Sequence, residues 1–346
     1  MRPRRILVCR LRALGDVIRT FPAIAGLRDM MSADVEIDYL CQEEAAHAAC
    51  LLKDVNRVHI LPPLERSLSN HRDPLRISLS AWSSNLQIVR KLKYDTYVDF
   101  HGVFYSALFG VLAGIPDRVG FDRAWVKDGS ELCYSRRIQL SDKAVNRFDR
   151  HSFLVRSAFP GVEESKPRIA IPVQEEPTRQ GKVVFCPGSS DAGILKRWPA
   201  ENYADLAKRI AGFTSRPVTV TWGPHEEELA EQVVRSAAGA AIIAPPTNVK
   251  DLFHMISSAG LVVGNDGAQL HIASVLQRPC LMILGPTDPN VNAPSQQTFS
   301  RFLHSGVDCS PCPCWDYECP NEHRCMRLVT VSDVASELYN MWQQLP

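Results

Sequence analysis

The sequence lacks any segment that would carry it into or across a membrane. Its longest weakly polar stretch, residues 104–115, is too short to span a bilayer, which takes about 20 apolar residues. The only apolar run near the start, residues 6–9, is interrupted by Arg10 and Arg12, so no targeting segment is recognised. Six of the 11 cysteines are scattered singly through apolar segments, which is typical of buried, reduced thiols. Together these features predict a cytoplasmic protein.

Positive and negative charges are also nearly equal in number. The formal net charge is +1, with 39 Lys and Arg against 38 Asp and Glu, so bulk electrostatics do not favour nucleic acid as a partner. Simple repeats and low-complexity tracts are absent as well. The chain is 45% hydrophobic and 22% charged, which is typical of a soluble globular protein, and 346 residues exceed one comfortable core. Two domains are therefore expected.

Short β-prone runs alternate with helical patterns in both halves of the chain. This alternation predicts a doubly wound parallel sheet in each half, with ligands bound beyond the carboxyl ends of the strands. Residues 71–84 are polar and predict a loop or insertion, and a segment rich in Pro, Glu and Gln marks an interdomain linker. The expected parts are an N-terminal domain (1–165), a linker (166–180), a C-terminal domain (181–330) and a terminal amphipathic helix packing back toward the first domain (331–346).

The stretch 247–289 organises the second half as helix, strand, small-residue loop, helix and strand. A strand that turns directly into a helix aims backbone N–H groups and the positive end of the helix dipole at an anion, usually a phosphate. The backbone of Gly267 and Ala268 would supply these donors, while Asp266 and His271 would reach the rest of a nucleotide. The alternative is an ordinary strand-to-helix turn with a capping Asp and a surface His.

Three further strand ends carry polar side chains. Ser189 and Ser190 offer hydroxyls to an anion, and Lys196 could neutralise a departing diphosphate, unless it is a plain surface lysine. Glu226 could accept the hydroxyls of a ribose, with Glu227 as the neighbour that the sequence does not exclude. In the first half, Asp16 is either the N-cap of a helix or a general base.

Ordered motifs in both halves resemble the heptosyltransferase family, which moves a heptose from ADP-heptose onto a lipopolysaccharide core. The N-terminal motif is matched by Asp16, Val17 and Pro22, and a central motif by Pro187-Gly188-Ser189 with Lys196 and Trp198-Pro199. The C-terminal signature is matched by Gly264-Asn265-Asp266, His271, Ala273, Pro279 and Gly285-Pro286-Thr287. The family usually has Ser or Thr and then Gly after the Asp. Gly267 and Ala268 stand there instead, so only backbone donors are carried over.

This resemblance implies a GT-B fold, an α/β architecture of two Rossmann-like doubly wound domains facing a central cleft. It also implies inverting, metal-independent transfer, with Asp16 as base, Lys196 stabilising the leaving diphosphate and no required cofactor. Arg12, His101 and Arg118 are then expected to bind the acceptor, although His101 could be a loop histidine and Arg118 a buried structural ion pair. The partners implied are ADP-heptose, a lipopolysaccharide core acceptor and, through Arg2, Arg4, Arg5 and Arg12, the inner membrane surface.

Other functions remain open. One alternative is a transferase that uses another nucleotide sugar or another acceptor. A second is a non-catalytic nucleotide-sugar-binding subunit, and the missing hydroxyl at Gly267 favours this second alternative. Nucleotide-sugar epimerases share this fold, but no separate motif for their catalytic acids is found.

A cysteine cluster near the end of the chain is the densest feature. Cys309, Cys312, Cys319 and Cys325 could hold a structural zinc or iron, with Cys314 as a fifth thiol in the same segment. The spacing lacks the two separated Cys-x2-Cys pairs of a zinc ribbon, so free thiols or one local disulfide are the alternatives.

Overall fold

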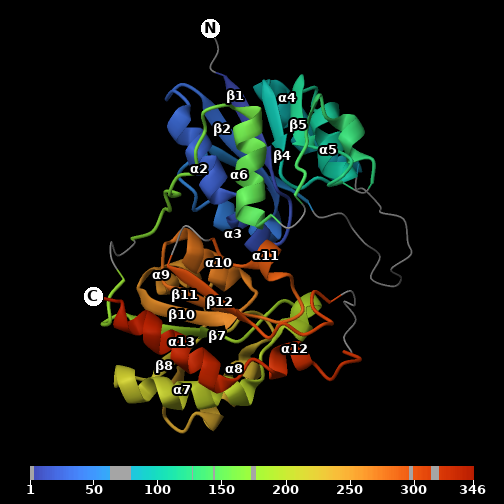
Figure 1. Ribbon diagram of the computed structural model, residues 1–346. Coiled ribbons are helices and arrows are strands. Elements are labelled where there is room, and N and C mark those ends of the chain that lie inside the picture. The colour runs from blue at the N-terminus through green and yellow to red at the C-terminus, as the bar shows by residue number, and fades with distance from the viewer. Residues whose placement is uncertain are drawn as a thin grey trace. The chain divides into compact units, whose positions relative to one another are not determined.

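The computed structural model describes residues 4–62, 79–126, 128–142, 145–172, 177–295, 299–312 and 319–346. It divides into two compact units (Figure 1). The first comprises Met1–Lys143 and Phe148–Ala170, and the second Ala144–Arg147 and Ile171–Pro346.

The first unit is built on a six-stranded parallel sheet in the order β3-β2-β1-β4-β5-β6. Its strands are β1 (Arg5–Cys9), β2 (Glu36–Gln42), β3 (Arg57–Leu61), β4 (Thr96–Asp99), β5 (Asp117–Phe121) and β6 (Arg136–Ile138). Its helices are α1 (Leu14–Ile18), α2 (Phe21–Met30), α3 (Glu43–Ala49), α4 (Leu79–Leu92), α5 (Phe104–Leu112), the 3₁₀ turn η1 (Ser130–Cys133) and α6 (Arg147–Ala158). The apolar runs that predict β1 and β3 give those strands with the same bounds.

The first residues of α2 and α4 decide how two segments of the first unit fold. The helical pattern after Gly15 is divided, because α2 begins at Phe21 with Pro22 in its first turn, where the missing N–H costs nothing. The predicted loop over residues 71–84 is wrong in its last part, because α4 begins at Leu79. Residues 63–78 lie outside the described part of the chain.

The second unit repeats the plan with a six-stranded parallel sheet in the order β12-β11-β10-β7-β8-β9. Its strands are β7 (Lys182–Cys186), β8 (Val218–Val220), β9 (Ala241–Ile243), β10 (Ala259–Asn265), β11 (Cys280–Leu284) and β12 (Ser300–His304). Its helices are η2 (Asp191–Lys196), α7 (Ala200–Thr214), α8 (Glu227–Ser236), α9 (Val249–Ser257), α10 (Ala268–Val275), α11 (Pro289–Asn292), α12 (Arg324–Arg327) and α13 (Val331–Gln343). Every residue of β10 and β11 is buried, as expected for central strands covered on both faces.

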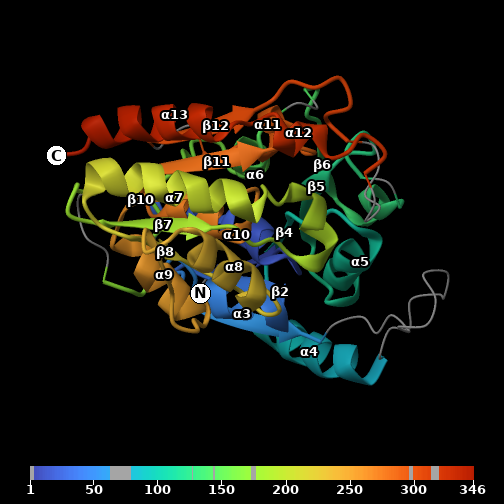
Figure 2. The ribbon, with the colours of Figure 1, turned by 90° about the horizontal axis from the view of Figure 1, so that it is seen from below.

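The terminal helix α13 packs inside the second unit. Its apolar face joins the core cluster that also contains residues of α7, and Tyr339 and Trp342 contact the ring of Phe213. Figures 1 and 2 show α13 and α7 lying side by side. The apolar face of α13 is taken up within its own unit. The predicted packing back toward the first domain stays a prediction. Among the described residues, no helix combines the length and apolar character needed to cross a membrane.

Replacing Leu338 of α13 by Ala should lower the free energy of unfolding by about 2–5 kcal/mol, because a fully buried side chain is truncated and a cavity remains. Urea unfolding measures the change. Asn340→Ala on the exposed face of the same helix is the control, expected to shift the free energy by less than about 0.5 kcal/mol. Equal effects of the two substitutions would contradict the packing of α13 in this core.

Candidate functional site

The loop after β1 presents Asp16 at the carboxyl edge of the first sheet. Asp16 lies in the first turn of α1, whose N-cap is Ala13, so the alternative prediction of Asp16 as N-cap is wrong. Its Oδ1 accepts from Nη1 of Arg19 at 2.8 Å, and its Oδ2 forms an ion pair with Nη2 of Arg10. The Asp16 side chain is only 14% exposed. The two guanidinium groups thus hold the Asp16 carboxylate in a fixed orientation.

The neighbouring strand ends fix this loop in place. The backbone N–H of Leu11 donates to Nδ1 of His101 at 3.1 Å, and that of Ala13 donates to Oε1 of Glu44 at 2.8 Å. Ala13 adopts the left-handed region with φ 67°, an unfavourable conformation for a residue with a Cβ. His101 follows β4, and Glu44 lies in the first turn of α3, directly after β2. Residues that follow both neighbours of β1 therefore hold the segment that carries Asp16.

His101 is a neutral hydrogen-bond donor in this arrangement. Burial, with the nearby charges of Arg10 and Arg12, lowers the pKa of its imidazole to about 3. Since Nδ1 accepts from Leu11, the ring proton lies on Nε2. Arg12 is exposed on the same loop. The structure therefore brings His101 and Arg12, both predicted as acceptor ligands, together with Asp16.

Asp99 is a positioning residue that the sequence did not reveal. One oxygen of this fully buried carboxylate accepts the backbone N–H groups of His101 and Gly102, at 2.8 and 3.2 Å. The other accepts the hydroxyls of Ser106 and Tyr134, at 2.7 and 2.8 Å. Burial raises the pKa of Asp99, against the effect of these four donors. An aspartate at the end of a strand, two residues before a His-Gly pair, was the available signal.

Arg118 makes several hydrogen bonds to the backbone. Its Nε donates to the carbonyl of Cys133 at 2.7 Å, and its Nη1 donates to the carbonyls of Ile115 and Pro116 at 2.6 and 3.2 Å. The guanidinium thus ties chain segments together through backbone carbonyls. A role of Arg118 in binding the acceptor stays a prediction.

The arginines predicted to touch a membrane lie at both ends of β1. Arg4 and Arg5 lie at the amino end, where Arg5 pairs with Glu36 at 2.8 Å. Arg12 lies beyond the carboxyl end, about 16 Å away along a five-residue strand. Arg2 lies outside the described residues, and contact with a membrane surface stays a prediction.

The neutral state of His101 is open to direct measurement. We expect side-chain NMR to show the Nε2–H tautomer unchanged from pH 8 to pH 5, because protonation would place a second charge beside Arg10 and Arg12 in a buried site. A midpoint for His101 near the ordinary value of about 6.5 would contradict the assignment.

In the second unit, Lys196, Asp266 and His271 form a chain of contacts between two loops. Nζ of Lys196 lies 2.9 Å from Oδ2 of Asp266, and Nε2 of His271 lies 3.6 Å from Oδ1. The Asp266 side chain is 4% exposed and that of Lys196 is 22% exposed. Asp266 is therefore an anchor that orients Lys196. Gly267 is the N-cap of α10 and Ala268 its first residue, as the predicted anion site requires.

The two serines after β7 are not equivalent. The Ser189 hydroxyl is buried, donates to the carbonyl of Gly193 at 2.7 Å and accepts from Nε of Arg197 at 3.1 Å. Ser190 is exposed, and its Oγ lies on the same side of Gly193 as the Lys196 stem. Ser189 thus shapes the loop, whereas Ser190 is the serine that a ligand can reach.

Glu226 is committed to holding this loop. Its Oε1 accepts the backbone N–H of Ser189 at 2.6 Å, and its Oε2 accepts that of Gly223 at 3.0 Å. A Cβ on Gly188 would lie 2.0 Å from the carboxylate, so only glycine allows this approach. Arg197 adds an ion pair at 3.2 Å. The carboxylate predicted to receive a ribose therefore already joins the ends of β7 and β8.

Asn265 is the second residue that sequence reasoning missed. Its Oδ1 accepts the backbone N–H of Trp198 at 3.1 Å and the hydroxyl of Tyr203 at 2.9 Å, and its Nδ2 donates to the carbonyl of Pro187 at 2.6 Å. One buried amide thus joins three loops. The Asn in the Gly-Asn-Asp signature was the available signal.

Replacing Asn265 by Asp should lower the free energy of unfolding by at least about 2 kcal/mol, because an oxygen then faces the Pro187 carbonyl where an N–H donated. Urea unfolding gives the value. Tyr203→Phe removes a single hydrogen bond to the same side chain and should cost about 1 kcal/mol. If Asn265→Asp costs no more than Tyr203→Phe, the amide does not hold the loops as described.

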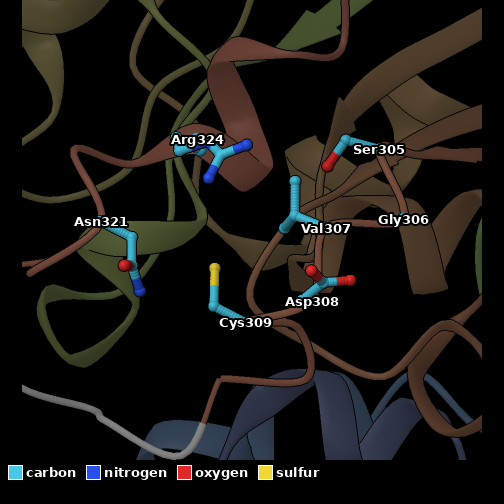
Figure 3. Close-up of a pocket in the computed structure, with 7 residues that line it drawn as sticks. All are labelled: Ser305, Gly306, Val307, Asp308, Cys309, Asn321 and Arg324. Carbon is cyan, nitrogen blue, oxygen red and sulfur yellow. The ribbon is translucent and has the colours of Figure 1, made fainter.

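The cysteine segment packs beside the Lys196 loop. Nε2 of His323 contacts the carbonyl of Leu195, and the Ser305 hydroxyl donates to the carbonyl of Cys325 at 2.9 Å. A cavity of about 370 Å³ opens nearby, with the sulfur of Cys309 and the guanidinium of Arg324 turned toward the same space (Figure 3).

A structural metal is not supported in this segment. Across residues 299–312 and 319–346, as in the other described ranges, no three His, Cys, Asp or Glu side chains are arranged to hold one. Cys309, Cys319 and Cys325 are free thiols, and Cys314 lies outside the described residues. Burial raises the pKa of Cys325 to about 11. The predicted zinc or iron site is therefore without support from the described residues.

The two units share one plan, in which polar side chains follow three adjacent strands at the carboxyl edge of a Rossmann-like parallel sheet. This architecture, matched over nearly the whole chain by a solved structure, is the GT-B fold. That structure, "E. coli heptosyltransferase WaaC with ADP-2-deoxy-2-fluoro heptose", has a TM-score of 0.74 at 18% identity and covers 97% of this chain and 99% of its own.

Residues 83–324 match the sequence model of glycosyltransferase family 9 (heptosyltransferase), so the chain belongs to this family. It is 24% identical over 295 residues to lipopolysaccharide heptosyltransferase 1 of Escherichia coli (strain K12), covering 83% of this chain and 89% of the relative. It is 26% identical over 324 residues to lipopolysaccharide heptosyltransferase 1 of Pseudomonas aeruginosa, covering 89% and 86%.

Proposed function

We propose that the chain transfers a heptose from ADP-heptose to a hydroxyl of a lipopolysaccharide core acceptor, with inversion and without a catalytic metal. The observation that carries the donor half is the Lys196–Asp266 pair at 2.9 Å beside the N-terminus of α10. Relatives named lipopolysaccharide heptosyltransferase 1 and the structural neighbour holding a fluorinated ADP-heptose analogue support the choice of donor and acceptor.

On the donor side, the second unit offers cation and N–H donors to a diphosphate. Lys196 keeps its charge at a fixed place because Asp266 holds its ammonium, and Ser190 adds an exposed hydroxyl. The first N–H groups of α10 at Gly267 and Ala268 complete the set. Such preorganised donors stabilise negative charge as it develops on the leaving group. His271 supports Asp266, while Glu226 and Ser189 keep the loop in shape.

On the acceptor side, Asp16 takes the proton of the attacking hydroxyl. The oxygen of the acceptor bonds to the anomeric carbon as the bond from that carbon to the phosphate oxygen breaks, and ADP departs. A single displacement of this kind inverts the anomeric centre. Nε2–H of His101 and the exposed guanidinium of Arg12 would orient acceptor oxygens beside Asp16.

Asp16→Asn should lower kcat by about 10²–10⁴-fold, because the amide cannot accept the proton. ADP binding, which is assigned to the other unit, should be unchanged in calorimetry. Transfer is followed as ADP released from ADP-heptose with a lipopolysaccharide core acceptor. Asp34→Asn, an exposed acid of the same unit, is the control expected to retain full activity.

Turnover by Asp16→Asn close to that of the unmodified chain would contradict the role of Asp16. Tight ADP binding by the unmodified chain, with neither transfer nor donor hydrolysis, would instead favour a nucleotide-sugar-binding subunit. This alternative is favoured by Gly267, which stands where the family usually has Ser or Thr.

A further inference from the structure

The two arginines that hold Asp16 do so in different ways. Arg19 closes α1 as its C-cap, three residues after Asp16, and its side chain is 5% exposed. The same helical turn therefore fixes donor and acceptor together. Arg10 comes from the other side, from the residue directly after β1, and its side chain is 12% exposed. Arg10 is thus the partner that can leave without disturbing α1.

Arg10 also uses only half of its binding edge. The Nε and Nη2 groups of a guanidinium form a fork that suits both oxygens of a carboxylate or phosphate. Here Nη2 binds Asp16, whereas Nε is buried and has no hydrogen-bond partner in the described part of the chain. A buried N–H without a partner is unfavourable. An anion that fills the whole fork would therefore compete with Asp16 for Arg10.

The surroundings attract such an anion. Arg12 is exposed on the same loop, and Arg10 and Arg12 both act electrostatically on His101. Across this loop, the Glu44 carboxylate is already used by the backbone N–H of Ala13. A sugar acceptor that carries a carboxylate or phosphate would find cations here before its hydroxyl reaches Asp16.

We propose that Arg10 is an acceptor-operated latch on the catalytic base, released from Oδ2 of Asp16 when an anionic group of the acceptor fills its Nε–Nη2 fork. This rests on the proposed function and adds the order of events. Without acceptor, Arg10 keeps the base weakly basic, so water does not attack the donor. With acceptor, the proton of the attacking hydroxyl passes to the freed oxygen, the new glycosidic bond forms and ADP leaves.

The latch is tested by hydrolysis of ADP-heptose without acceptor, in which water would add to the anomeric carbon and release ADP and heptose. Arg10→Gln should release ADP about tenfold faster than the unmodified chain, because the Asp16 carboxylate loses a cationic partner that weakens it as a base. Arg235→Gln, an exposed arginine of the second unit, is the control and should match the unmodified chain. Hydrolysis by Arg10→Gln at or below the unmodified rate would overturn the latch.

A second readout needs no donor. Inorganic phosphate or acetate is titrated while NMR follows the Nε–H signal of Arg10, identified by its loss in Arg10→Gln. A saturable shift is expected, with several-fold tighter binding in Asp16→Asn, where the competing charge is gone. The anion that binds more tightly shows whether a phosphate or a carboxylate of the acceptor suits the Arg10 guanidinium.

An unchanged signal, or equal affinity in Asp16→Asn, would overturn the proposal. These results are independent of the proposed function, which fails separately if the unmodified chain does not bind ADP-heptose in calorimetry.

Discussion

The side-chain amide of Asn265 holds the second unit's site together. The loops after β7 and before α7 flank η2, and the loop after β10 lies far from both in sequence. Each of the three has backbone groups that its own helix or strand cannot satisfy. Asn265 supplies both an acceptor and a donor to them from a buried position at the end of β10. With these loops fixed, Lys196 lies within 2.9 Å of the neighbouring Asp266.

In the first unit, a buried carboxylate has the role that the Asn265 amide has in the second. Asp99, at the end of β4, fixes the turn that carries His101, and His101 in turn accepts the N–H of Leu11 in the Asp16 loop. In both units the reactive side chain is partly exposed and its support is buried. Parallel sheets favour this arrangement, because neighbouring strand ends meet along one edge.

The strands that depend mainly on residues close together in the chain could be predicted from the sequence. The largely apolar runs 5–9, 182–186 and 280–284 form strands with the predicted bounds, since such runs between turns leave little choice. Residues 57–61 also form a strand, although Arg57 and His59 interrupt their apolar residues. β9 was missed, because it has only three residues and two of them are exposed. The start of α4 was missed because a polar composition hid it.

Roles that depend on tertiary partners could not be predicted. Glu226 and Arg118 were predicted to bind ligands. The packing adds that Glu226 accepts a backbone N–H from another loop and that Arg118 donates to a nearby carbonyl. The choice between Ser189 and Ser190 likewise depended on burial and on the position of Gly193. A motif places a residue at the right edge of the sheet, and only the packing decides whether it faces the ligand.

The central claim is that the second unit is built for an adenine nucleotide diphosphate held by Lys196 and the N-terminus of α10. Calorimetric titration of the purified chain with ADP, UDP and GDP, without added metal, tests it most directly. The account predicts saturable binding with a clear preference for ADP. Preference for UDP or GDP, or no binding of any of the three, would contradict it.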